Sequence, residues 1–234
     1  MRLRRLVPLT ALTAVLVQCA PAPAPPTPPS TTTTTTTAPT TTLTTPEPRP
    51  ATVDTVTAAD LGATWRPGCP VSPDQLRRVE LDFWGSDGRL HRGELVVDAA
   101  ITDAVIDVFA RLAALRFPIE KMNSPNRYPG AEDELSMRDN NTSAFNCRGI
   151  PGSTSWSWHA YGRAVDINPL VNPYVDARGH VEPATGTPWL DRSRRDAGML
   201  HDGDPVVEAF VTRGWRWGGH WRTPIDYQHV ELPR

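Results

Sequence analysis

Two strand-like stretches lie on either side of a short glycine-containing turn, and the first of them alternates apolar and polar residues from Val79 to Phe83. They span residues 79–84 and 90–97, and Gly85-Ser86-Asp87-Gly88 separates them. Alternation with a period of two places every second side chain on one face of a strand. Two such stretches joined by a short turn predict a β-hairpin.

The apolar residues after this hairpin change to helical spacing. Residues 99–115 have apolar side chains at Ile101, Val105, Val108, Phe109, Leu112 and Leu115, which predicts an amphipathic helix. A second helix is predicted over residues 204–213, with Gly214 as its cap.

Shorter elements are predicted between and after the two helices. Phe117-Pro118-Ile119 is expected to start a strand, and residues 120–156 are polar and predicted to form a loop around the site. Strands over residues 162–167 and 228–232 are expected to lie side by side. Together these elements predict an α+β domain with a small antiparallel sheet flanked by helices.

The first 55 residues have a different composition from the rest of the chain. Residues 1–19 have a basic start and a short apolar run, as in an export signal, and their end at Cys19 resembles a bacterial lipobox. Residues 20–55, rich in Pro and Thr, predict a disordered tether. The folded domain is then expected over 56–234, outside the cytoplasm, either lipid-anchored through Cys19 or simply secreted.

Charge and cysteine content restrict the partners. The chain has 24 Lys and Arg against 26 Asp and Glu, a net charge of −2, which argues against a nucleic-acid partner. We expect a monomer, with membrane contact only through a lipid on Cys19. If that cysteine is lipidated or removed, Cys69 and Cys147 remain and predict a disulfide outside the cytoplasm.

Candidate metal ligands lie in two segments of the C-terminal part. Residues 157–166 read SWHAYGRAVD and supply His159 and Asp166, and residues 226–229 read DYQH and supply His229. Two imidazoles and one carboxylate suit Zn²⁺, and a catalytic zinc ion takes three protein ligands. Gly162 would permit the turn that brings His159 back to the metal.

Two acidic residues near His229 compete for the role of general base. In a strand from Tyr227 onward, Glu231 shares a face with His229. Asp226 reaches the same side only if the strand begins after it, and Thr223-Pro224 makes a turn there plausible. Residue spacing alone leaves both candidates open.

The two segments together resemble the M15 peptidases, the zinc D-alanyl-D-alanine carboxypeptidase family that includes VanY-like enzymes and phage endolysin peptidases. Residues 157–166 match the motif S-x-H-x-x-G-x-A-x-D at every fixed position, and the acid three residues before His229 matches the second motif. The resemblance covers roughly residues 60–234. It implies the M15 fold, zinc ligands His159, Asp166 and His229, and Asp226 as the base.

The same resemblance implies an arginine upstream of the first motif that stabilises the oxyanion. Arg148 is the first choice, with Arg138 and Arg127 as rivals. Ser157 is expected either to bind a substrate carboxylate or to orient His159. Tryptophans of the C-terminal third are expected to belong mainly to the core, with others lining a substrate groove.

The function implied by the resemblance is hydrolysis of peptidoglycan stem peptides, with the D-Ala-D-Ala bond as the first candidate. Many family members have Glu at the base position, and Asp226 is more like the endolysin-type branch. Cleavage of an L-Ala-D-Glu bond is therefore an alternative. A zinc-containing, non-catalytic wall-binding module is the alternative from another class.

Overall fold

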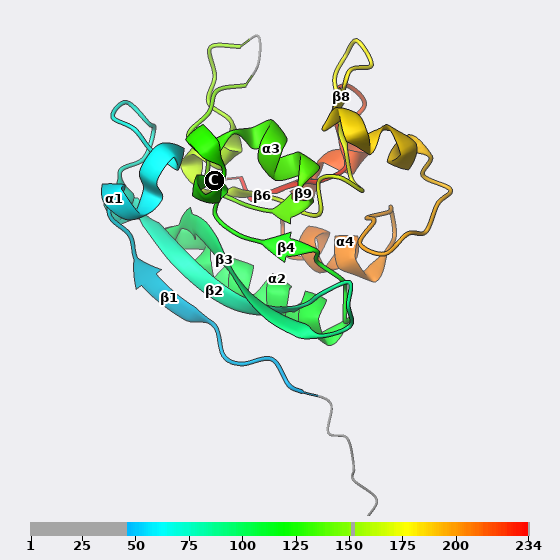
Figure 1. Cartoon of the computed structure of the whole chain (residues 1–234), viewed down its shortest axis with the longest axis horizontal. Helices are drawn as coiled ribbons and strands as arrows, with labels where there is room; N and C mark the ends of the chain where they lie inside the picture. The colour runs from blue at the N-terminus through cyan, green and yellow to red at the C-terminus, as the bar shows by residue number, and fades with distance from the viewer. Residues whose placement is uncertain (1–45, 151–152, 234) are drawn as a thin grey trace, which may run out of the picture. The chain divides into compact units, whose positions relative to one another are not determined.

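The computed structural model describes residues 46–150 and 153–233 (Figure 1). The export signal and lipidation site predicted at residues 1–19 lie outside the described residues, as does most of the predicted tether. Within the described part of the chain, no helix is both long and apolar enough to cross a membrane.

A three-stranded antiparallel sheet forms the N-terminal layer, with the strand order β1-β2-β3. It consists of β1 (Thr52–Thr55), β2 (Leu76–Trp84) and β3 (Leu90–Asp98). The predicted hairpin is confirmed, because β2 and β3 pair along their full length. Its turn uses Gly88 at a φ of 71°, a conformation that glycine adopts without strain.

Helix α2 (Thr102–Ala114) covers one face of this sheet and supplies much of the core (Figure 1). The predicted helix is confirmed, although its first residues, Ala99–Ile101, form a 3₁₀ turn. The Asp98 side chain accepts a hydrogen bond from the backbone N–H of Ala100 at 2.9 Å, which satisfies one of the free donors at a helix start. The apolar residues at helical spacing are buried: Ile101, Val105, Val108, Phe109 and Leu112.

Two predictions for the middle of the chain are wrong. No strand starts at Phe117, because Pro118 forms only an isolated bridge with Trp84; proline lacks the N–H that would extend a ladder. The stretch 120–156 is also more ordered than a loop. It contains α3 (Asp133–Arg138) and a short parallel pair of strands, β4 (Lys121–Met122) and β5 (Asn141–Thr142).

The C-terminal part is built from short strands in two antiparallel sheets. One has the order β6-β11-β9 and the other β10-β7-β8. Helix α4 (Pro205–Val211) packs beside α2 and confirms the predicted second helix. The predicted pairing of residues 162–167 with residues 228–232 is confirmed over a shorter span, by β6 and β11. The strands of these two sheets are β6 (Ala164–Asp166), β7 (Tyr174–Val175), β8 (Val181–Glu182), β9 (Arg216–Trp217), β10 (Ile225–Asp226) and β11 (His229–Glu231).

The ordered domain begins before residue 56, where the tether was expected to end. Strand β1 pairs with β2 through a register that includes Val53 opposite Val79. Upstream of it, the Arg49 guanidinium forms an ion pair with Asp82 at 2.9 Å. All four β1 side chains are exposed, so the sequence shows no buried face there. Backbone pairing, the Arg49–Asp82 ion pair and hydrogen bonds from Arg92 to Pro50 and Thr52 order this segment instead.

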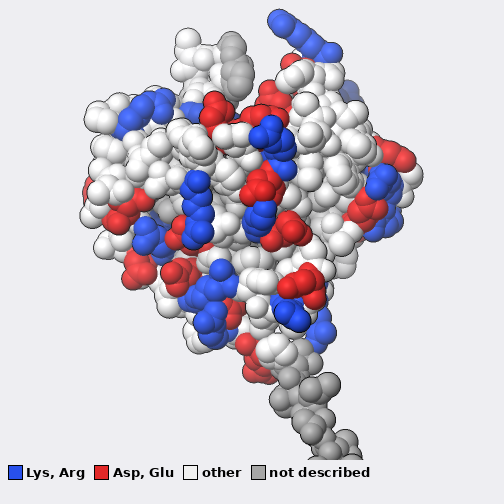
Figure 2. Space-filling model, viewed as in Figure 1, with Lys and Arg blue, Asp and Glu red and all other residues white. Residues whose placement is uncertain are grey.

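The surface has no large area of a single charge sign on the face drawn in Figure 2, where basic and acidic side chains alternate. This pattern agrees with the balanced charge of the sequence. The described domain has helices together with small, mainly antiparallel sheets and is therefore of the α+β class, as predicted.

Candidate metal centre

A short turn places His159. The 3₁₀ helix Trp158–Tyr161 begins after Ser157, whose hydroxyl oxygen accepts a hydrogen bond from the His159 backbone N–H at 3.3 Å. The turn ends at Gly162, with a φ of 66°. A β-carbon at Gly162 would lie 2.6 Å from the Asp98 backbone nitrogen, so the turn requires glycine, as predicted. The Ser157 hydrogen bond reaches only the His159 backbone, and a role of Ser157 in substrate binding or in orienting His159 stays a prediction.

Strand pairing places the other two predicted ligands. In the antiparallel pair of β6 and β11, Asp166 lies directly opposite His229. Side chains at directly opposite positions on one face of such a pair are close neighbours. Asn168, at a φ of 43°, follows β6 and directs the chain away from the site.

The donor atoms of His159, Asp166 and His229 converge on one buried point. The Nε2 atom of His159 lies 3.1 Å from Nδ1 of His229 and 3.1 Å from Oδ2 of Asp166. The same Nδ1 of His229 lies 3.2 Å from Oδ1 of Asp166. Ligands of a tetrahedral zinc ion lie about 3.3 Å from one another when metal–ligand distances are near 2.0 Å. The cluster therefore has the dimensions of a metal site.

The outer nitrogens of the two rings determine which atoms face the metal. Nδ1 of His159 lies 2.6 Å from the carbonyl oxygen of Ala144, and Nε2 of His229 lies 3.2 Å from Oε2 of Glu231. Both partners only accept, so each ring carries its proton on the outer side. Each inner nitrogen then carries a lone pair, and the two lone pairs face each other and the Asp166 carboxylate. This arrangement fits a bound cation, and carbonyl and carboxylate partners behind the rings are typical of zinc-binding histidines.

The electrostatics of the cluster also favour a cation. Burial lowers the pKa of His229, but its hydrogen bonds to Asp166 and Glu231 outweigh burial and raise this pKa to about 10. Burial raises the pKa of Asp166, yet the contacts with His159 and His229 hold it well below its usual range. The site therefore attracts positive charge, either a proton or a metal ion.

Asp226 lies in the same cavity as the three ligands. Its Oδ1 atom is buried and has no hydrogen-bond partner among the residues that the structure describes. Burial is the main reason that the pKa of its carboxyl rises to about 7; Asp166 adds to the rise, while His229 and Arg148 oppose it. A carboxyl group with such a pKa can exchange a proton near neutral pH.

Glu231, the alternative base, has a different position. Its carboxylate contacts Nε2 of His229, on the side of the ring that faces away from the other two ligands, and Arg216 lies 3.8 Å away. Glu231 is therefore placed to orient His229. The geometry favours Asp226 as the acid that is free to take a proton.

Arg148 reaches the cavity, unlike its two rivals. One of its guanidinium nitrogens lies 3.0 Å from Asp133 and 3.7 Å from Asp166. Its side chain is 31% exposed, so it is not simply a solvated arginine. In the described part of the chain, Arg127 and Arg138 do not line this cavity.

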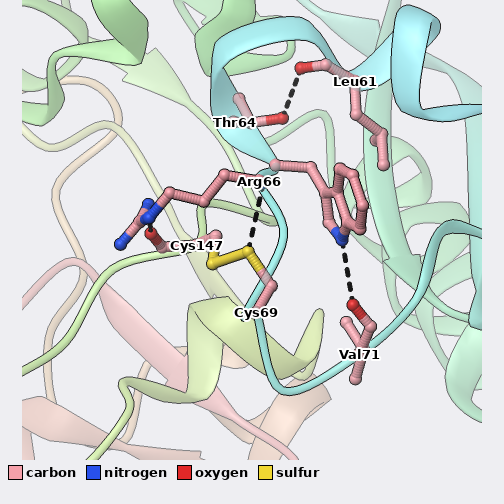
Figure 3. Close-up of a disulfide and its surroundings, with 7 residues drawn as sticks. Leu61, Thr64, Arg66, Cys69, Val71 and Cys147 are labelled. Atoms are coloured by element: carbon pink, nitrogen blue, oxygen red, sulfur yellow. Dashed lines mark hydrogen bonds between the residues drawn. A yellow bond between two sulfur atoms is a disulfide. The ribbon is translucent and has the colours of Figure 1, made fainter.

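The predicted disulfide lies next to Arg148 in the chain. Cys69 and Cys147 are bonded, with their Cα atoms 5.9 Å apart. The backbone of Cys147 is held further, because its N–H donates to the Thr64 carbonyl at 2.9 Å. Its carbonyl accepts from the Arg66 guanidinium at 2.5 Å (Figure 3). In the chain-entropy model a loop of this length contributes about 4 kcal/mol. The bond ties the beginning of the domain to the segment that carries Arg148.

The cavity has a volume of about 290 Å³, and most of its further lining residues were not assigned by sequence reasoning. Trp158 and Trp221 are the exceptions, because some tryptophans of this part were expected to line a groove. Asp133 and Met137 come from α3, four positions apart on one helix face. Tyr174 and Glu182 come from the paired strands β7 and β8. No pattern in the sequence connects these residues with the two motifs. The full set of additional lining residues is Asp133, Met137, Ile150, Trp158, Tyr174, Glu182, Trp221, Pro224 and Gln228.

Comparison with known families agrees with this geometry. Residues 151–232 match a family model of the M15 peptidases that is described as D-alanyl-D-alanine carboxypeptidase. The match shows that residues 151–232, about a third of the chain, are similar to the M15 peptidases. Neither the curated proteins nor the solved structures contain a match to the chain.

The M15 match covers a smaller part of the chain than the resemblance over residues 60–234 predicted. It includes His159, Asp166, His229 and Asp226. Arg148 lies before the matched segment and joins the site through the fold. The match supports a peptidase, with a His-Asp-His cluster that is a possible metal site.

Proposed function

We propose that the protein is a zinc-dependent peptidase that works outside the cytoplasm and hydrolyses peptidoglycan stem peptides, with the D-Ala-D-Ala bond as its first candidate. One observation carries this proposal. Three converging donor atoms share a cavity with an unpaired, buried carboxyl group and an arginine. A structural zinc site has four protein ligands, whereas a catalytic site has three and leaves one position open.

Each residue has a defined task in amide hydrolysis. His159, Asp166 and His229 would hold the zinc ion, which when bound polarises the scissile carbonyl and lowers the pKa of water to about 7. Asp226 takes a proton from the attacking water and delivers it to the leaving nitrogen as the C–N bond breaks. Arg148 faces the developing negative charge on the former carbonyl oxygen. Asp133 holds the Arg148 guanidinium in place.

The location is part of the proposal. The basic and apolar start of the chain, the Pro/Thr-rich stretch and the lipobox-like end at Cys19 support export, with a lipid on Cys19 or simple secretion. Peptides of the cell wall are the substrates that an exported peptidase of this family would meet. The Asp at the base position keeps the L-Ala-D-Glu bond as the second candidate.

Digestion of purified stem peptides, followed by mass spectrometry with and without a chelator, tests this function. Loss of one terminal alanine that the chelator abolishes is the expected result. Release of the stem from its L-alanine would replace the carboxypeptidase with an endopeptidase. A protein that holds one zinc ion per chain yet cleaves neither bond would be a wall-binding module, and the proposal would be wrong.

A further inference from the structure

Gln228 occupies the cavity beside the metal ligands, and neither motif assigns it a role. It lies between Asp226 and His229 in the chain, and only 2% of its surface is exposed. The cavity lining includes both Gln228 and Met137 of α3. A polar side chain at such a position either has a full set of internal partners or meets a ligand.

Internal partners of the Gln228 amide group are few. Its Nε2 donates to the Met137 sulfur at 3.5 Å, and a thioether is a weak acceptor. Its Oε1 is buried and has no donor in the described part of the chain. Leaving a buried acceptor unpaired is unfavourable, so the amide oxygen points to a ligand that brings a donor.

A second unpaired acceptor lies in the same cavity. Oδ1 of Asp226 is also buried and without a hydrogen-bond partner within the described residues, and the two oxygens are not bonded to each other. Two acceptors on one short segment fit a ligand that carries N–H groups. The nitrogen of a peptide bond provides such a donor before cleavage, and the free amine provides more afterwards.

The segment that carries both acceptors is held firmly by its backbone. The indole N–H of Trp217 donates to the Tyr227 carbonyl at 2.8 Å, and the Ile167 N–H donates to the Gln228 carbonyl at 2.9 Å. Behind Asp226, a β-carbon at Gly218 would lie 2.5 Å from the Asp226 carbonyl oxygen, so this approach requires glycine. The acceptors are therefore fixed before a ligand enters, as efficient catalysis requires.

We propose that the Gln228 amide oxygen accepts a hydrogen bond from the N–H of the scissile peptide bond and holds that nitrogen beside Asp226. This inference rests on the proposed peptidase function and names a residue that selects amide over ester substrates. During hydrolysis, water adds to the carbonyl carbon, the C–N bond breaks, and the proton taken up by Asp226 moves to the nitrogen. Gln228 acts before and during this transfer, because it fixes where the leaving nitrogen lies.

A pair of substrates tests this role. A stem pentapeptide that ends in D-Ala-D-Ala has the N–H, and its analogue that ends in D-Ala-D-lactate has an ester oxygen in its place. In Gln228→Met, which keeps length and removes the acceptor, we expect the ratio of kcat/KM for amide over ester to fall about tenfold, the size of one neutral hydrogen bond. Equal losses on both substrates, or an unchanged ratio, would overturn the proposal.

Two controls separate this effect from a change in folding. Gln228→Glu keeps an acceptor and should retain more of the amide preference than Gln228→Met. The same exchange at Gln75, which ends the 3₁₀ helix before β2 and lies outside the cavity, should leave the ratio unchanged. Bound zinc and thermal unfolding are measured for each variant, and Gln228→Leu replaces Gln228→Met if the latter does not fold.

The wild-type protein distinguishes failure of this inference from failure of the proposed function. If it removes the terminal residue of neither substrate, the proposed carboxypeptidase activity is wrong, and so is the role of Gln228 at that bond. If it cleaves the pentapeptide and the ratio is insensitive to Gln228→Met, only the role of Gln228 is wrong.

Discussion

Strands β2 and β3 of the N-terminal layer have nine residues each, whereas the strands that carry Asp166 and His229 have three. The long strands are held by a continuous ladder and by the core under α2. Around the short strands, the ligands are positioned by the register of β6 with β11, by the turn at Gly162, and by hydrogen bonds between side chains and backbone. We therefore expect substitutions in the two regions to separate effects on stability from effects on catalysis.

The largest expected effect is on catalysis in the C-terminal region. Asp226→Asn keeps the shape of the side chain but removes the group that accepts a proton, so we expect kcat to fall about 10²–10⁴-fold. Zinc content and thermal stability should stay at wild-type values, and this result would distinguish a general base from a metal ligand. A turnover number close to that of the wild type would instead assign the base to Glu231.

In the N-terminal layer the largest effect should be on stability. Phe109 is 2% exposed and packs edge-on against Phe210 of α4. Phe109→Ala should therefore lower the free energy of unfolding by about 3–5 kcal/mol, measured by urea denaturation, with activity per folded molecule unchanged. The exposed Val53 is the control, since Val53→Ala should change stability by no more than about 0.5 kcal/mol. Loss of catalysis in folded Phe109→Ala would contradict the separation of the two regions.

A smaller effect on catalysis should follow from loosening Arg148. Asp133→Asn removes the ion pair at 3.0 Å, and we expect kcat to fall about tenfold, as for the loss of one charge-assisted contact. Asp139→Asn, which breaks the exposed pair with Lys121, is the matched control and should leave kcat unchanged. If both variants keep wild-type kcat, Asp133 does not position the arginine.

The smallest effect should be a pH dependence of stability in the N-terminal layer. Burial opposes ionisation of Asp82, but hydrogen bonds from Arg49 and Arg92 outweigh it and lower its pKa. The ionised carboxylate therefore stabilises the fold above the unfolded-state pKa of about 3.9, and this contribution is lost as the pH falls through the folded-state value. Asp82→Asn should be less stable than the wild type at neutral pH, and the difference should shrink in acid. A difference that is independent of pH would contradict this assignment.

The same contrast explains what sequence reasoning could predict. In the N-terminal layer, α2 follows from periodicity, because its buried residues recur every third to fourth position. The hairpin follows from two strand-like stretches on either side of a glycine-containing turn. Strand β1 was missed, since its four side chains are exposed and its order comes from backbone pairing and from Arg49 and Arg92. Pro118 looked like the start of a strand but has no N–H to extend one.

In the C-terminal region the motif, and not periodicity, located the site. The turn at Gly162 and the pairing of the two strands could be inferred from the sequence, whereas the register that sets Asp166 opposite His229 required the structure. The contributions of Asp133, Tyr174 and Glu182 could not, because they come from separate short elements that meet only in the folded chain. The part played by Glu231 behind His229 likewise required the observed geometry.

Zinc titration of the metal-free protein tests the central claim most directly. Followed by calorimetry, the wild type should bind one zinc ion per chain, and His229→Ala should lose this site while it keeps the fold seen by circular dichroism. Equal zinc binding by the wild type and folded His229→Ala would contradict a metal centre formed by His159, Asp166 and His229.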